Sequence, residues 1–332
     1  MLDRNNLEIY DRIPLPESFS IPQRSRLYFL EPIGIRTPFT ESVSSYLTRL
    51  AQEHCLPLKK LIMGEIAPAI LKDRYQPEML SKSVSSIFGN SNAKPAINGM
   101  KEITRSLVDA LEQLTLRQDL RYLTCLTYQG VVKDKSLFRQ HKAWCPECFH
   151  QQKQERTIVY EPLLWSFKDV NYCLEHSSRL RDRCPRCDST QKAIANHSRL
   201  GYCDKCKQWL GHDLNSEVEI AEKERQVIKG TGELIATAPT LDSPATLPDV
   251  IQKLKLIQFS FERSLRQDLS QFIVLGKILE RLKITIKQHK DKPVNLAGLL
   301  IPTCSFAKIS VGQFMKEDVL TVSKMLGINL KI

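Results

Sequence analysis

The sequence contains no long apolar run and no apolar N-terminal core. Apolar stretches such as LAGLLI (296–301) are far shorter than the roughly 18 residues of a membrane span. The first residues, MLDRNNLEIYDRIPLPE, lack the apolar segment of a secretory signal. We therefore expect a cytoplasmic protein without a membrane partner, in which cysteines stay reduced and disulfides are rare.

Motifs of several enzyme classes are missing as well. The chain has no His-Glu-x-x-His pair and no Gly-x-x-x-x-Gly-Lys-Ser/Thr phosphate loop. No histidine is followed two residues later by glutamate, as the zinc deaminases require. We therefore expect a protein without catalytic residues.

Aromatic residues are scarce, at 7% of the chain, whereas basic residues are in excess. The formal net charge is +11, which suggests an acidic partner such as nucleic acid. Aromatic side chains do not alternate with the basic ones, so no base-stacking surface is indicated. The composition favours contacts with a DNA backbone over base reading.

Cysteine, by contrast, is plentiful and patterned. Ten cysteines are present, and seven of them form four pairs together with one histidine. The pairs are Cys145–Cys148, Cys173–His176, Cys184–Cys187 and Cys203–Cys206, each with two residues between its members. The last two pairs form C-x2-C-x15-C-x2-C, which is typical of a tetrahedral zinc site, and the first two form C-x2-C-x24-C-x2-H.

The pattern predicts two structural Zn2+ ions. Cys145, Cys148, Cys173 and His176 would hold the first, and Cys184, Cys187, Cys203 and Cys206 the second. A thioredoxin-like redox pair is the weaker interpretation, because four pairs lie within one short segment. His150 could compete with His176 as a ligand, although His176 has the correct spacing. Three isolated cysteines are interpreted as small buried hydrophobic residues, namely Cys55, Cys125 and Cys304.

The remaining patterns predict a mainly α protein. A short strand is expected at 26–35, and two helices around a tight turn at 37–67 give a helix-turn-helix outline. Thr40 is expected to cap the first helix, with Glu41 in its first turn, and Pro57 to begin the second. The outline is compatible with a DNA-reading motif or with ordinary helical packing. Further helices are predicted over 96–128, 217–237 and most of 247–332, with 268–289 the strongest.

These elements predict three main parts. They are a helical N-terminal domain with the helix-turn-helix-like element, a central tandem zinc-knuckle or zinc-ribbon segment, and a C-terminal helical domain. The expected boundaries are an irregular arm at 1–25, the N-terminal domain at 26–135, the zinc segment at 136–215, a helix at 216–237, a linker at 238–246 and the C-terminal domain at 247–332.

Basic residues gather around the second cysteine quartet. They offset the negative charge of a four-thiolate zinc site or contact phosphate, and the sequence leaves both interpretations open. The candidate nucleic-acid contacts are Lys59, Lys60, Arg181, Arg183, Arg186, Lys205 and Lys207.

Several of these stretches together resemble the TniQ family, which includes the TnsD-like proteins of Tn7-type transposons. They are PFTESVSSYLTRLA, LRQDLRYLTCL, AWCPECF, LLWSFKDVNYCLEH, RCPRC and GYCDKC. The family's Pro-x-x-Glu-Ser-x-x-Ser motif corresponds to Pro38, Glu41, Ser42 and Ser45, and its tryptophan before the Cys-x-x-His pair corresponds to Trp165. Thr40 stands where a glycine is common. The resemblance covers roughly residues 26–236.

The resemblance implies a non-catalytic target-selection adaptor of a Tn7-like, CRISPR-associated transposon. Such a protein links a Cascade-like CRISPR effector complex, with its guide RNA, to the TnsC-like AAA+ ATPase that directs DNA transposition. The alternative is a TnsD-like protein that recognises an attachment site in DNA directly. A homodimer is compatible with either role.

Overall fold

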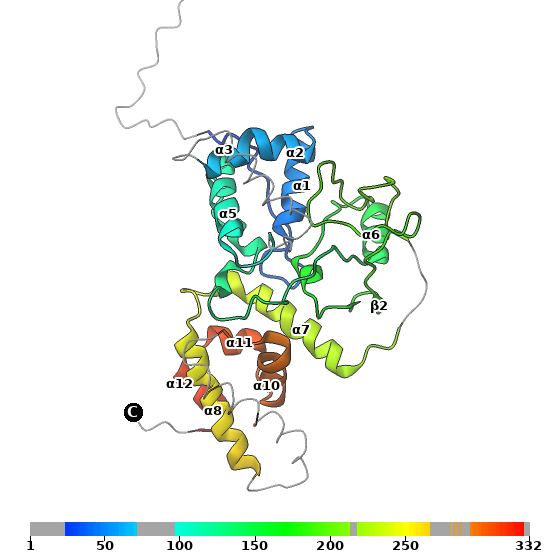
Figure 1. The fold of residues 1–332 in the computed structure, drawn as a ribbon. Coiled ribbons are helices and arrows are strands. Elements are labelled where there is room, and N and C mark those ends of the chain that lie inside the picture. The colour runs from blue at the N-terminus through cyan, green and yellow to red at the C-terminus, as the bar shows by residue number, and fades with distance from the viewer. Residues whose placement is uncertain are drawn as a thin grey trace, which may run out of the picture.

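The structure is a computed structural model. It describes residues 24–71, 97–212, 218–265, 280, 283, 286 and 293–328. Within these ranges the chain is mainly helical, as expected, with a single two-stranded sheet in the central segment (Figure 1). The predicted arm at 1–25 and the predicted helix at 268–289 lie almost entirely outside the described residues.

The N-terminal helices include the expected helix-turn-helix outline. They are α1 (Val43–Glu53), α2 (Leu58–Leu61), the π-helical turn η1 (Ile62–Ile66), α3 (Ala67–Ile70) and α5 (Glu102–Thr115). The apolar stripe of α1, including Tyr46, Leu47 and Leu50, is fully buried. Pro57 precedes α2, as predicted.

Two expectations at the ends of α1 were wrong. Ser42, not Thr40, caps the helix, because its side chain accepts a hydrogen bond from the Ser45 amide. Cys55 is exposed and not buried, because it stands in the turn after α1 with a φ of 54°.

The segment 26–35 is irregular and not the predicted strand. It has no neighbouring strand and is held by single bonds instead: the amides of Arg26 and Leu27 donate to the Leu114 carbonyl, and the Tyr46 hydroxyl donates to the Leu30 carbonyl. An extended segment without a ladder partner forms no sheet.

The helix predicted over 96–128 is shorter than expected. It ends at Thr115 because Leu116 adopts the left-handed conformation, with a φ of 60°. Two 3-10 turns follow, η2 (Leu120–Leu123) and η3 (Leu126–Tyr128).

The central segment consists of short elements joined by tight turns. They are α6 (Pro146–Gln154), the 3-10 turn η4 (Leu163–Ser166) and the antiparallel strands β1 (Tyr172–Cys173) and β2 (Ser178–Arg179). So little regular structure buries few backbone groups in ladders, so other bonds must hold this segment.

The C-terminal part is helical. It comprises α7 (Glu222–Thr237), η5 (Ala238–Thr240), α8 (Leu247–Leu265), the π-helical turn η6 (Leu296–Leu300), α10 (Ile301–Phe306), α11 (Val311–Lys316) and α12 (Val319–Met325). Figure 1 shows α7 running between the N-terminal helices and the group formed by α8, α10, α11 and α12.

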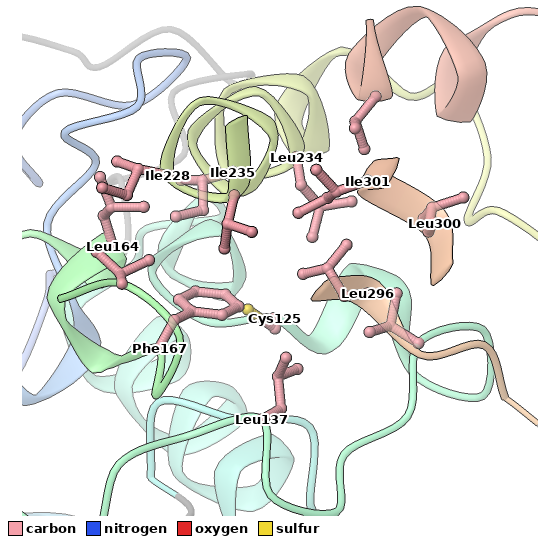
Figure 2. Packing of buried hydrophobic residues seen from close by; sticks show 14 of the residues in the cluster. Cys125, Leu137, Leu164, Phe167, Ile228, Leu234, Ile235, Leu296, Leu300 and Ile301 are labelled. Atoms are coloured by element: carbon pink, nitrogen blue, oxygen red, sulfur yellow. The ribbon is translucent and has the colours of Figure 1, made fainter. Parts of the chain in front are cut away.

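The described hydrophobic residues form two core clusters. The smaller one joins α1, α2 and α5, and the larger one runs from the central segment through α7 to α12. Figure 2 shows Ile228, Leu234 and Ile235 of α7 facing Leu164 and Phe167, with Cys125, Leu296 and Ile301 close by. Cys125 and Cys304 are buried, as expected. The central segment and the C-terminal helices therefore share one core, with α7 as its axis.

The domain boundaries given above stay a prediction. Among the described helices, none combines the length and the apolar composition that crossing a bilayer requires.

Candidate metal centres

The first candidate centre lies at the start of α6. Cys145 precedes the helix and Cys148 stands in its first turn, while Cys173 ends β1 and His176 lies in the turn to β2. Pro146 occupies the first helical position, where its missing amide is not needed. The helix start and the hairpin thus bring their side chains together from two directions.

The spacing of the ligand atoms in this cluster fits one tetrahedral ion. The Cys148 and Cys173 sulfurs are 3.6 Å apart, and the His176 Nδ1 atom lies 3.3 Å from Cys148 Sγ and 3.7 Å from both Cys145 Sγ and Cys173 Sγ. Bonds of about 2.3 Å to sulfur and about 2.0 Å to nitrogen place tetrahedral neighbours about 3.5–3.8 Å apart. The four atoms therefore surround a space of the right size for Zn2+. His176 rather than His150 belongs to this cluster.

The second candidate centre is built from two turns of the same design. In one, the Cys184 amide donates to the Ser189 carbonyl and the Asp188 amide donates to the Cys184 carbonyl. The Cys203 turn repeats both bonds, from Cys203 to Gln208 and from Lys207 to Cys203. Asp188 and Lys207 have positive φ angles of 51° and 58°, which close the two turns alike.

The sulfurs of these two turns meet at distances that also suit one tetrahedral ion. Cys184 Sγ lies 3.6 Å from Cys206 Sγ, and Cys187 Sγ lies 3.7 Å from Cys203 Sγ. In each cluster all four ligand atoms lie within 4.8 Å of one another. The structure thus brings together all eight predicted ligands, in the two predicted groups.

Polar neighbours of the ligands complete both clusters. Gln151 Oε1 lies 3.1 Å from His176 Nε2, which fixes the proton on Nε2 and leaves Nδ1 free to bind a metal. Gln191 Nε2 donates to Cys203 Sγ at 3.4 Å. The Ser189 hydroxyl, 3.1 Å from Cys187 Sγ, lowers the pKa of that thiol. Hydrogen bonds of this kind favour the deprotonated sulfur that a metal requires.

The two clusters are fastened to each other. Trp144, before Cys145, exchanges both backbone hydrogen bonds with Arg181, just before Cys184, at 2.9 and 2.8 Å. The His212 amide donates to the Pro146 carbonyl, and the Trp209 ring lies 5.9 Å from the Phe149 ring. The two clusters therefore form one unit, which matches the prediction of a tandem segment.

A buried polar node joins this unit to α1. Glu41 is fully buried, with its carboxylate 3.1 Å from the Arg49 guanidinium. The Ser45 hydroxyl donates to Glu41 at 2.8 Å and accepts from the Glu161 amide at 3.1 Å. Burial raises the pKa of Glu41 to about 7, and the positive charge of Arg49 limits the rise. Glu41 was expected in the first turn of α1, but it precedes the helix and faces inward.

Backbone bonds strengthen this connection. The Ser42 amide donates to the Glu161 carbonyl at 3.0 Å, and the Leu163 amide donates to the Thr40 carbonyl at 2.7 Å. Trp165, in the turn η4 that follows, packs edge-on against Phe149 of α6 at 5.6 Å. The chain between the node and Trp165 thus links α1 to the helix that carries Cys148.

These features can be compared with known protein families. Residues 32–180 match the model of the TniQ family. The chain contains a TniQ domain. The resemblance inferred from the sequence is thereby confirmed over this stretch, which holds the Glu41 node and the whole first cluster. The second cluster and the C-terminal helices lie beyond the matched residues.

No curated protein matches the chain. The TniQ domain is therefore the one assignment that these comparisons provide, and the roles of single residues rest on the geometry above.

The predicted nucleic-acid contacts occupy two regions next to the TniQ domain's helices and the second cluster. Lys59 and Lys60 are exposed on α2. Three residues of the second cluster also serve its turns: Arg183 pairs with Asp188 at 2.9 Å, Arg186 donates to Gln208 at 3.4 Å, and Lys207 donates to the Asp204 carbonyl at 2.8 Å. Arg181 and Lys205 are exposed. Contact of these residues with nucleic acid stays a prediction.

Proposed function

We propose that this protein is a target-selection adaptor of a Tn7-like transposon, and that it acts by binding other proteins rather than by catalysis. The TniQ domain over residues 32–180 is the observation that carries this proposal. In finer terms, the chain would connect a Cascade-like effector with its guide RNA to a TnsC-like AAA+ ATPase. Its location would be the cytoplasm.

The two clusters support the adaptor role through their chemistry. Each offers four sulfur or nitrogen ligands, and a Zn2+ ion held by four protein ligands has no open position for a substrate. Cys145, Cys148, Cys173 and His176 would hold one ion, and Cys184, Cys187, Cys203 and Cys206 the other. Bound zinc would supply folding free energy of roughly 10–16 kcal/mol per site in finger-like segments.

The physical connection between the parts supports the same role. An adaptor must keep two binding surfaces in a fixed relation, because a loose linker lowers the effective concentration of the second partner. The Glu41 node, the Trp144–Arg181 bonds and the shared core around α7 tie the parts by buried contacts. This arrangement suits a connector.

Affinity capture with purified components tests the proposal. The zinc-loaded full chain should retain the TnsC-like ATPase and the effector complex of its own transposon in separate captures. A Cys55→Ser variant, changed at an exposed isolated cysteine, is the matched control and should retain both. Capture of neither partner by the unchanged chain would contradict the adaptor role.

The second candidate function is direct recognition of an attachment site in DNA, as in TnsD-like proteins. The observation that favours it is the pair α1 and α2 across a tight turn, with Lys59 and Lys60 exposed on the second helix. This function predicts a footprint at one DNA site in the absence of guide RNA. Equal, salt-sensitive binding to every sequence would count against it.

A further inference from the structure

A basic groove lies between the N-terminal helices and the first cluster. Its main cavity has a volume of about 670 Å³ and is lined by the segment 134–141, by Lys101 at the start of α5 and by Lys168 after η4. A second cavity of about 370 Å³ shares Lys135, Ser136 and Lys168 with it and adds Lys133. The shared residues make the two cavities one continuous groove.

Backbone pairing gives this groove a firm wall. The Arg139 amide donates to the Ser166 carbonyl, and the Lys168 amide donates to the Leu137 carbonyl, each at 2.9 Å. The Leu137 side chain points into the core beside Phe167 (Figure 2). The Arg139 guanidinium is used internally, because it donates to the Val170 carbonyl and the Asn171 side chain. Neighbours of Leu137 are therefore held along the groove.

The lysines of the groove carry uncompensated charge. Lys101, Lys133, Lys135 and Lys168 are exposed, and their ammonium groups form no hydrogen bond or ion pair with any residue that the structure describes. Three carboxylates stand along the same groove, on Asp134, Asp169 and Asp182. The excess of positive charge remains available to an anionic ligand.

We propose that the basic groove binds the phosphodiester backbone of a nucleic acid. Flexible ammonium groups without fixed partners attract phosphates wherever they lie along a strand, without reading bases. The groove is open and continues through two cavities, which suits an extended polyanion better than a small anion. Phe138 lines it but packs against Phe167 at 5.1 Å, so base stacking is not its main contribution.

This inference deepens the proposed function, since it rests on a transposition protein meeting nucleic acid and names where it does so. The groove is separate from the residues predicted from the sequence around the second cluster. Its test uses the zinc-loaded chain alone, without ATPase or effector. A failure here therefore leaves the capture of protein partners unaffected.

The test is fluorescence anisotropy with labelled 30-residue duplex DNA, single-stranded DNA and RNA over a series of salt concentrations. The triple variant Lys101→Ala, Lys135→Ala, Lys168→Ala removes three groove charges. The matched control Lys223→Ala, Lys229→Ala, Lys255→Ala removes three exposed lysines of α7 and α8. Zinc content and melting temperature are measured for all three proteins.

The groove variant should lose about 10- to 100-fold in affinity at 0.15 M salt. Its plot of log K against log salt should be shallower by about 2.7 for duplex and about 2.1 for a single strand, while the control keeps the slope. The three probes show which nucleic acid the groove prefers. Equal losses in both variants, absence of binding by the unchanged chain, or equal competition by polyglutamate would each overturn the proposal.

Discussion

At the scale of single residues, the Glu41 node explains the family's N-terminal motif. Glu41, Ser42 and Ser45 all bond to one another or to residues 161–163, which lead to Trp165. The motif therefore fastens α1 to the metal-binding unit rather than facing solvent. Pro38 has a related role, because it packs against α7 at Gly232.

The raised pKa of Glu41 predicts a defined pH dependence of stability. Its pKa is about 7 in the folded chain against an ordinary value of 4.5, so the folded state binds the proton more tightly. A carboxyl shifted in this direction stabilises the fold at low pH, and this stabilisation is lost as the pH rises through 7. The free energy of unfolding of the unchanged chain, minus that of Glu41→Gln, should fall by about 2 kcal/mol between pH 5.5 and 7.5.

Urea unfolding of the zinc-loaded proteins measures this difference. Both proteins carry the same metal clusters, so the pH dependence of metal binding cancels in the subtraction. A difference that stays constant or rises with pH would show that Arg49 keeps Glu41 ionised, against the expectation.

The metal ligands were predictable residue by residue, whereas their polar neighbours were not. Two-residue spacing in four pairs encodes a metal site directly, because each short turn aims two side chains at one point. Gln151 and Gln191 have no such spacing, and their contacts depend on how separate segments meet. Burial of Glu41 was equally hidden, since an acidic residue near a helix start usually pairs with the helix dipole.

At the scale of elements, α7 shows why two glycines stand inside a helix. An added Cβ at Gly232 would lie 2.8 Å from Pro38 Cβ, and one at Gly230 would lie 3.0 Å from the Ile301 side chain. The glycines let the helix approach the TniQ domain on one side and α10 on the other. Close packing thus outweighs the lower helix propensity of glycine.

Gly232→Ala should lower the free energy of unfolding by roughly 1–3 kcal/mol, because the rigid proline cannot move aside. Gly64→Ala is the matched control: no atom lies within 4 Å of an added Cβ there, so the change should be neutral or stabilising by up to about 1 kcal/mol. Thermal and urea unfolding check both. A stabilised Gly232→Ala variant would mean that α7 does not pack closely on Pro38.

The twin turns of the second cluster give a prediction for metal loss. Cys184→Ser removes one of four ligands, and a structural zinc contributes as much free energy as a whole domain, at roughly 10–16 against 5–15 kcal/mol. Native mass spectrometry should find one zinc instead of two, and proteolysis should cut within residues 184–210. Cys55→Ser should keep both ions. A Cys184→Ser chain that stays folded and active with one zinc fewer would contradict the structural role.

The helices were predictable in kind but not in extent. Apolar stripes of α1 and α5 repeat at helical spacing, and both helices formed. The end of α5 depends on the backbone of Leu116, which no side-chain pattern reveals. Similarly, the apolar residues of 26–35 suggested a strand, yet a strand requires a partner that the local sequence does not specify.

At the scale of the whole molecule, three connections form one frame. The Glu41 node ties α1 to the first cluster, the Trp144–Arg181 pairing ties the first cluster to the second, and the core around α7 ties both to the C-terminal helices. The TniQ domain and the residues beyond it are thus joined by buried contacts. We propose that this frame holds the two partner-binding surfaces of an adaptor in a fixed relation.

The most direct test of the adaptor role is whether the chain joins its two partners into one particle. Mass photometry of the ATPase, the effector complex and the zinc-loaded chain should show a species with the mass of all three. That species should be missing when the chain is left out or replaced by Cys184→Ser. Formation of the joint particle without the chain, or its absence when all three are present, would contradict the account.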